Sequence, residues 1–154
     1  MNTYEIQKTV SRDKCLNKCF LGVFPSDKLP TIYTKPACFI ANTDPSNEPG
    51  QHWVAMFFDR YVEYFDSYGL EPPEPFARYN PEILNTYCLQ NIGSVVCGEY
   101  CIYYLHKRMR GAPLQTIALN LRNRSDSDRL VGAFVDKLRV YGQPENCQHC
   151  NPKT

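Results

Sequence analysis

Long apolar runs are missing from this 154-residue sequence. No stretch approaches the roughly 20 consecutive apolar residues that a membrane-spanning helix needs. The first residues, Met1 to Lys8, also lack the apolar segment of a secretion signal. We therefore expect a soluble intracellular protein without a membrane partner.

Histidine is scarce, which limits the candidates for a base that titrates near neutral pH. The three histidines are His52, His106 and His149. His106 lies inside an expected helix and His149 lies near the end of the chain. His52 follows Pro49-Gly50 and opens an expected strand, where its ring can face a cleft. A histidine in that position is commonly structural, so His52 needs partners before it can be assigned a role.

Cysteine, by contrast, is abundant, with eight residues. Without a secretion signal, free thiols are favoured over a disulfide framework. Cys147 and Cys150 have a spacing found in zinc sites, and Cys15 with Cys19 could add a second pair. Nothing in the sequence brings the two pairs together, so we predict no metal site. The roles of Cys88, Cys147 and Cys150 stay open.

The net charge of +1 hides an asymmetry between the two parts of the chain. Residues 1–99 hold 8 Lys and Arg against 12 Asp and Glu, whereas residues 100–154 hold 9 against 4. A basic C-terminal half can bind an anionic partner such as nucleic acid. Solvated helix faces are the alternative explanation.

The pattern of apolar residues predicts an α+β fold with a small central mixed or antiparallel sheet flanked by helices. Aromatic residues make up 13% of the chain, which favours a sheet. The expected elements are a helical first 20 residues, strands at 37–41, 52–58 and 62–65, and helices at 76–87, 98–109, 114–121 and 126–140. Asp59-Arg60 is the expected hairpin turn, and Ser125 with Asp128 the expected capping box of the last helix.

We expect one domain over residues 1–154. Its core should extend from about residue 15 to residue 140, and residues 141–154 should form a flexible tail.

The strongest local signal for chemistry surrounds Cys97, which follows two β-branched residues and opens an expected helix. Backbone N–H groups at a helix start lower the pKa of a thiol and raise its thiolate fraction. Gly98 would let a substrate backbone approach closely. Cys101 lies one turn later and should face the core.

Two further residues could complete a site. Asp66 ends the strand expected to pair with the strand that His52 opens. Antiparallel neighbours lie about 5 Å apart, so its carboxylate could orient the imidazole. Gln90 precedes Cys97 by seven residues, and its amide could join a backbone N–H in an oxyanion hole. A turn-capping Asp and a solvated Gln are the structural alternatives.

The chain order His, Asp, Gln, Cys resembles that of the adenovirus protease (adenain) family. His-Trp at 52–53, Tyr-Phe-Asp-Ser-Tyr-Gly at 64–69 and Cys-Gly-x-x-Cys at 97–101 carry the resemblance, which covers about residues 15–110. The wider clan includes the ubiquitin-like-protein proteases. Papain-like enzymes place Cys before His and do not fit.

The resemblance implies a cysteine endopeptidase with its nucleophile at the start of a buried helix. In this family pattern Cys97 is the nucleophile, His52 the general base, Asp66 its orienting acid and Gln90 the oxyanion donor, while Trp53 packs beside the His-Asp pair. The implied substrates are viral or mobile-element precursor proteins, cut at Gly-containing sites during virion maturation. A monomer in the host nucleus or cytoplasm, or packaged in the virion, is implied as well.

Cofactors and other functions stay open at this point. The chemistry requires no cofactor, but the family uses DNA and an activating peptide. The segment between Tyr68 and Gln90 is shorter than in adenain, and Cys88 does not match the peptide-linked cysteine, so peptide activation is disfavoured. The alternatives are a protease or isopeptidase for ubiquitin-like modifiers, an acyltransferase, and a non-catalytic binding domain.

Overall fold

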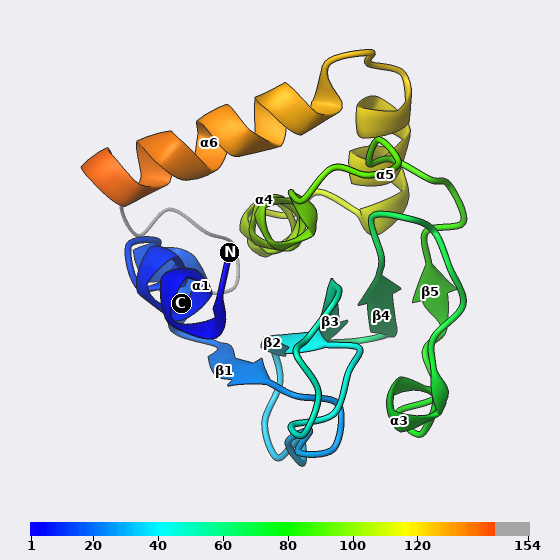
Figure 1. Ribbon diagram of the computed structural model, residues 1–154. Helices are drawn as coiled ribbons and strands as arrows, with labels where there is room; N and C mark the ends of the chain where they lie inside the picture. The colour runs from blue at the N-terminus through cyan, green and yellow to red at the C-terminus, as the bar shows by residue number, and fades with distance from the viewer. Residues whose placement is uncertain (144–154) are drawn as a thin grey trace.

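The computed structural model describes residues 1–143, which fold into six helices and five strands (Figure 1). The elements in chain order are α1 (Thr3–Val10), α2 (Lys14–Asn17), β1 (Phe20–Phe24), β2 (Ala37–Asn42), β3 (Trp53–Phe58), β4 (Val62–Phe65), α3 (Glu74–Ala77), β5 (Ile83–Leu84), α4 (Cys97–Met109), α5 (Leu114–Arg122) and α6 (Ser127–Tyr141).

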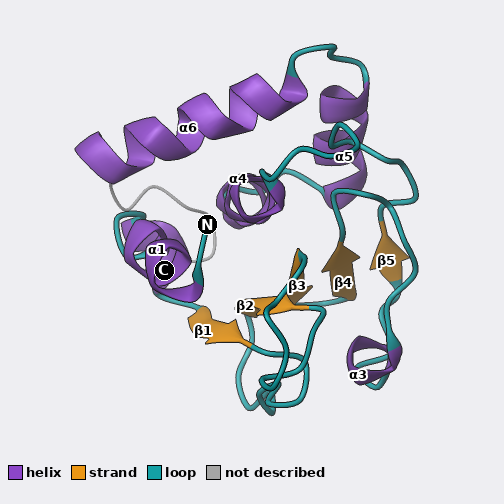
Figure 2. Cartoon of the chain, viewed as in Figure 1, coloured by secondary structure: helices purple, strands orange, loops and turns teal. Residues whose placement is uncertain are grey.

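The strands form one mixed sheet in the order β1-β2-β3-β4-β5 (Figure 2). The two central pairings, β2 with β3 and β3 with β4, are antiparallel, and β1 and β5 add parallel strands at the edges. The predicted α+β class and the three predicted strands are confirmed. The hairpin between β3 and β4 lies at Asp59–Tyr61, as expected.

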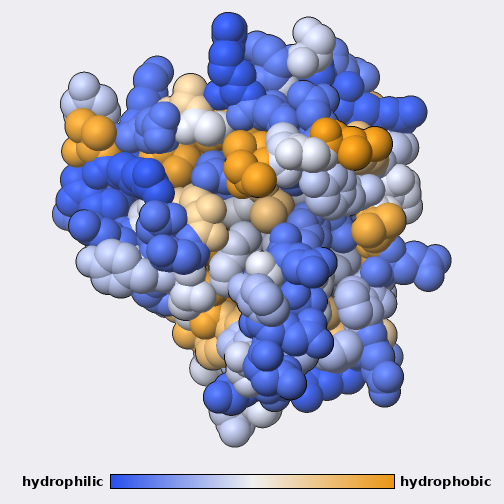
Figure 3. All heavy atoms as spheres, viewed as in Figure 1, coloured by the Kyte–Doolittle hydropathy of each residue, from blue (hydrophilic) through white to orange (hydrophobic). Residues whose placement is uncertain are grey.

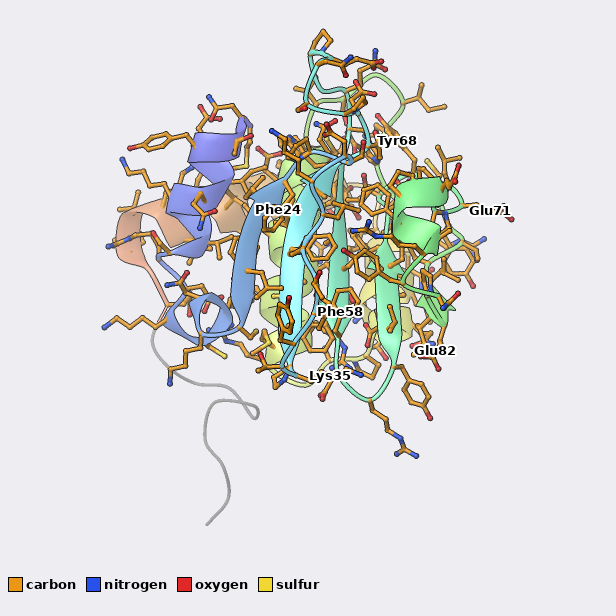
Figure 4. The ribbon with its side chains drawn as sticks, turned by 90° about the horizontal axis from the view of Figure 1, so that it is seen from below. Phe24, Lys35, Phe58, Tyr68, Glu71 and Glu82 are labelled. Carbon is orange, nitrogen blue, oxygen red and sulfur yellow. The ribbon has the colours of Figure 1, made fainter. Side chains whose placement is uncertain are left out.

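Both faces of the sheet are buried. Successive side chains of a strand point to opposite faces, so the central strands contribute residues to both apolar clusters. One face carries Ile40, Ala55 and Phe57 and packs against the helices, with α4 lying directly on β3 (Figure 1). The opposite face carries a smaller cluster that includes Phe39 and Phe58. Figure 4 shows Phe24 and Phe58 on that side, away from α4.

The helix predicted at 76–87 is wrong. The helical part is α3 alone, and residues 83–84 form β5, parallel to β4. Pro81 has no N–H for a helical hydrogen bond and disfavours the helical conformation of the residue before it. Asn80 has a φ of 52°, in the left-handed region that Asn tolerates, and the helix does not continue past it.

Other boundaries also differ from the prediction. The core starts before residue 15, because Ile6 and Val10 of α1 are fully buried. Phe20 begins β1 instead of lining a helix, and Tyr141 belongs to α6 instead of a tail. Residues 144–154, including His149 and the Cys147–Cys150 pair, lie outside the described residues.

The predicted capping box of the last helix is not formed. Asp126, not Ser125, is the N-cap residue of α6, and it makes no side-chain cap hydrogen bond. The carboxylate of Asp128 accepts a hydrogen bond from the Tyr100 hydroxyl at 2.7 Å instead. A tertiary contact to α4 has therefore replaced a local one.

The described cysteines are mostly free thiols, namely Cys19, Cys38, Cys88, Cys97 and Cys101. Cys15 is disulfide-bonded, so the expectation of reduced thiols does not hold there. Among residues 1–143 no three His, Cys, Asp or Glu side chains are grouped as metal ligands. Within the same range no helix has the length and apolar character needed to cross a bilayer.

A buried charge network joins α2 to α4. The Asp13 carboxylate is fully buried and lies 2.7 Å from His106 Nδ1 and 2.9 Å from Arg110 Nη2. Burial raises the pKa of Asp13, but the hydrogen bonds from His106 and Arg110 outweigh burial and hold that pKa below its ordinary value. His106 thus takes part in a buried contact between α4 and the start of α2.

We predict that Asp13→Asn lowers the free energy of unfolding by about 3 kcal/mol, because it removes the buried negative charge that His106 and Arg110 both bind. Asp126→Asn is the matched control, since its exposed pair with Arg124 should contribute under about 1 kcal/mol. Urea denaturation measures both. The wild-type advantage over Asp13→Asn should be present at neutral pH and disappear as the pH falls through the lowered pKa of Asp13. Equal losses in the two variants would contradict this role.

Candidate active site

Cys97 is the first residue of α4, at the position expected from the sequence. Its neighbour Val96 caps the helix without a side-chain hydrogen bond, so the N–H groups of the first turn are not taken by a cap. The Cys97 side chain is 9% exposed, whereas Cys101 is fully buried in the core, as predicted. Cys97 is thus the cysteine of α4 that stands at the boundary between core and surface.

His52 and Asp66 meet because β3 and β4 are antiparallel. The register pairs Ala55 with Phe65, which brings the residue before β3 next to the residue after β4. His52 Nε2 lies 2.7 Å from Asp66 Oδ1, and their side chains are 13% and 3% exposed. The sequence argument predicted this contact from the pairing of the two strands.

The His52 ring contacts Asp66, and its pKa responds to both Asp66 and the Cys97 thiol. Burial disfavours the charged ring, but the hydrogen bond to Asp66 and the interaction with Cys97 outweigh burial and raise the pKa of His52 to about 9. Cys97 therefore lies close enough to His52 for the two groups to influence each other's pKa.

The pKa of Cys97 shifts in the opposite direction. Burial raises it, but the interaction with His52 and backbone contacts at Trp53 and Gly98 outweigh burial, and the net pKa lies below its ordinary value. With the pKa of His52 raised and that of Cys97 lowered, the shared proton is favoured on the imidazole. The two pKa shifts thus favour a thiolate together with an imidazolium.

Asp66 is itself held in place from several directions. Its Oδ1 accepts a hydrogen bond from the Tyr68 backbone N–H at 2.8 Å as well as contacting His52. The Asn85 side chain brackets the Asp66 backbone, accepting from its N–H at 2.9 Å and donating to its carbonyl. Asn85 is only 4% exposed, so Asp66 has little freedom to turn away from the ring.

Two aromatic side chains flank the histidine. The Tyr68 ring lies against the His52 ring, with centroids 4.9 Å apart. The Trp53 indole N–H donates to the Met1 carbonyl at 2.9 Å and so fastens the N-terminal segment next to the site. A pocket of about 390 Å³ lies beside Trp53, between residues 1–3 and the loop of residues 42–50.

Gln90 is buried, at 2% exposed, and is not the solvated side chain of the structural alternative. Its Oε1 accepts from the Ser67 hydroxyl at 2.7 Å, and its Nε2 donates to the Ser94 carbonyl at 2.9 Å. An amide nitrogen carries two N–H groups, and the contacts within the described chain use one of them.

Gly98 faces the N-terminal segment. A Cβ at this position would lie 3.4 Å from Met1 Cβ and 3.5 Å from Ile6 Cδ1, which is ordinary van der Waals contact. The role expected for Gly98, which is to let a substrate backbone approach closely, stays a prediction.

The residues that support Asp66 and Gln90 were not predicted from the sequence. Ser67 and Tyr68 were noted only as part of the 64–69 motif, and no role followed from their type. Asn85 fell inside the segment wrongly predicted as a helix, so its place beside Asp66 could not be foreseen. The Asn80-Pro81 break was the signal that could have moved Asn85 to the sheet.

Comparison with known proteins supports a relationship to viral proteases. No protein-family model matches the chain. The cysteine protease S273R of African swine fever virus (isolate Tick/Malawi/Lil 20-1/1983) is 33% identical over 46% of this chain and 33% of the relative. The SUMO-1 cysteine protease S273R of the Warthog/Namibia isolate is 32% identical over the same shares. The matched region thus amounts to about a third of the length of these curated relatives.

The fold agrees with this relationship. The crystal structure of the African swine fever virus pS273R protease superposes with a TM-score of 0.52 at 20% identity, covering 94% of this chain and 68% of that one. This chain is related in sequence to the S273R cysteine proteases and has their α+β fold. The resemblance to adenain-like cysteine proteases is confirmed at that level.

We predict that iodoacetamide alkylates Cys97 with a pH midpoint below the ordinary thiol value of 9.0. His52→Ala should move the midpoint upward and slow alkylation at pH 7 by about tenfold, because one pKa unit changes the thiolate fraction tenfold. Mass spectrometry of the Cys97 peptide measures the rate. Both proteins should carry Cys88→Ser, since Cys88 is an exposed free thiol.

Identical midpoints with and without the imidazole would contradict the pairing of His52 with Cys97.

The raised pKa of His52 also favours the folded state at pH values below 6.5, and this contribution disappears as the pH rises through about 9.

Proposed function

We propose that this chain is a cysteine endopeptidase that uses Cys97 as nucleophile, His52 as base and Asp66 as the acid that orients it. The observation that carries the proposal is the contact of His52 with Asp66 at 2.7 Å, and the opposite pKa shifts of His52 and of the thiol at the start of α4 support it. The names of the related S273R proteins support cysteine protease activity.

The proposed reaction starts from the thiolate, which attacks the carbonyl carbon of the scissile peptide bond. The developing oxyanion accepts hydrogen bonds from the free N–H of Gln90 and from the Cys97 backbone. The His52 imidazolium then donates its proton to the leaving amine, and the C–N bond breaks to leave a thioester. His52 takes a proton from water as the water attacks this thioester, which releases the acid and regenerates the thiolate–imidazolium pair.

The proposed substrates are viral or mobile-element precursor proteins cut at Gly-containing sites during virion maturation. The surface next to the nucleophile suits a polypeptide, because Ile92 and Val95 in the loop before Cys97 are 93% and 81% exposed. Figure 3 shows apolar side chains on the face where α4 is viewed end-on. A protease for ubiquitin-like modifiers is the second candidate, favoured by the name of the SUMO-1 cysteine protease relatives.

We expect the purified chain to cleave a fluorogenic peptide with the sequence Leu-x-Gly-Gly and to lose cleavage entirely in Cys97→Ala. Cys101→Ala is the matched control from the same helix, since its buried thiol should not take part. A folded SUMO-1 fusion cut faster than the peptide would favour the modifier protease. No cleavage of either substrate by a folded protein whose Cys97 reacts with iodoacetamide would exclude the endopeptidase proposal for this chain.

We further propose that DNA, the cofactor implied by the adenain resemblance, binds in a groove between α1 and α6. A pocket of about 320 Å³ there is lined by Tyr4, Glu5, Lys8, Thr9, Arg12 and Arg139. Three of these side chains are cationic, and Tyr4 is 69% exposed beside them. The basic surface therefore combines both ends of the chain, whereas the sequence argument assigned it to the C-terminal half alone.

We predict that the double variant Lys8→Gln, Arg139→Gln binds duplex DNA more weakly than the wild-type chain. The slope of its log affinity against log salt concentration should also be smaller, by the equivalent of up to about two phosphate contacts. Fluorescence anisotropy with a labelled duplex at several salt concentrations measures both quantities. Lys28→Gln with Lys35→Gln is the control pair, because neither side chain lines the α1/α6 groove. An equal loss in the two pairs, or no binding by the wild-type chain, would contradict the groove as a DNA site.

A further inference from the structure

The three residues after β4 each contact a different part of the site. Asp66 binds His52, the Tyr68 ring contacts the His52 ring, and Ser67 binds Gln90. We propose that Ser67 is a positioning residue whose hydroxyl fixes the Gln90 amide for oxyanion binding. This inference rests on the proposed protease function and assigns a role to a residue that the sequence argument left without one.

Ser67 is tied to the Gln90 segment through both its side chain and its backbone. It is fully buried, and its Oγ lies 2.7 Å from Gln90 Oε1. Its carbonyl accepts from the backbone N–H groups of Leu89 at 2.7 Å and Gln90 at 3.1 Å. The turn that carries Asp66 therefore also holds the start of the loop leading to Cys97.

The contacts of Gln90 determine which way its amide faces. The Ser94 carbonyl can only accept, so the amide nitrogen must face it, and the contact is 2.9 Å. Oε1 then faces Ser67, whose hydroxyl must donate. With both contacts made, the second N–H of Nε2 is the donor left for a substrate oxygen.

The Ser67 hydroxyl also strengthens that donor. A hydrogen bond to an amide oxygen polarises the amide and makes its N–H groups better donors, and the effect is larger in a buried site. Without Ser67 the buried Oε1 has no partner within the described chain, and the amide is free to reorient. Loss of Ser67 should therefore impair the oxyanion site while leaving the His52–Cys97 pair intact.

Asn85 supplies the contrasting case for a test. It brackets the backbone of Asp66 and acts on the histidine side of the site. Ser67 and Asn85 are both almost fully buried polar side chains near the same turn. Their alanine variants therefore carry similar general costs and differ in which half of the site they disturb.

The experiment compares Ser67→Ala and Asn85→Ala by three readouts in the Cys88→Ser background. These are kcat/KM for the fluorogenic peptide, inhibition by a peptide aldehyde, and the rate of Cys97 alkylation by iodoacetamide. The aldehyde forms an adduct with an oxyanion, whereas alkylation forms none. Removal of an oxyanion donor typically costs about 10²–10³ in rate.

We expect Ser67→Ala to lower kcat/KM by about tenfold to a hundredfold and to weaken aldehyde inhibition by a similar factor, with alkylation unchanged within twofold. Asn85→Ala should instead slow alkylation at pH 7 and raise its pH midpoint. Ser67→Ala should add no further loss in a Gln90→Ala background, because the two residues act as one unit.

The inference would be overturned if Ser67→Ala cleaved the peptide within twofold of the parent protein, or if its effect were equally large without Gln90. An altered alkylation midpoint in Ser67→Ala would likewise assign Ser67 to the histidine side. If Ser67→Ala does not fold, Ser67→Cys gives the same comparison with a weak donor of similar shape. Failure of the parent protein to cleave any peptide would count against the proposed function itself, and aldehyde affinity would then decide the role of Ser67.

Discussion

The antiparallel register between β3 and β4 is the constraint from which the site follows. It pairs Ala55 with Phe65, so the chain enters β3 at the same end of the sheet at which it leaves β4. His52 and Asp66 meet at that end, 2.7 Å apart. Helix α4, whose first residue is Cys97, packs across β3. A slip of one residue would send His52 to the other face of the sheet and separate it from both partners.

At this end of the sheet, burial and charge pairing shift the pKa values of His52 and Cys97 in opposite directions, and the effect of pairing is the larger. Burial disfavours both the imidazolium and the thiolate, yet the interactions between His52, Asp66 and Cys97 favour the charged forms. The hydrogen bonds that Asn85 and Tyr68 make to Asp66 keep the carboxylate in place, so that it can favour the charged ring. The arrangement of the three ionisable groups therefore depends on uncharged side chains and on backbone as well.

The N-terminal segment is a structural part of the site. Met1 accepts the Trp53 indole N–H and packs against Gly98, so the segment lies between the start of β3 and the start of α4. Ile6 and Val10 continue this packing into the core. Any substrate approaching Cys97 from this side must pass the Met1 segment or displace it.

The sequence by itself determined the strands β2, β3 and β4, the helix that Cys97 opens, and the pairing of His52 with Asp66, because apolar periodicity is local and a short hairpin joins β3 to β4. It could not place Asn85, whose segment carried a helical pattern that Pro81 interrupts, nor show that Gln90 is buried. These features depend on contacts between residues far apart in the chain, such as the bond from Ser67 to Gln90. Only the tertiary structure decided them, since a buried polar group is oriented by whichever distant partners satisfy its hydrogen bonds.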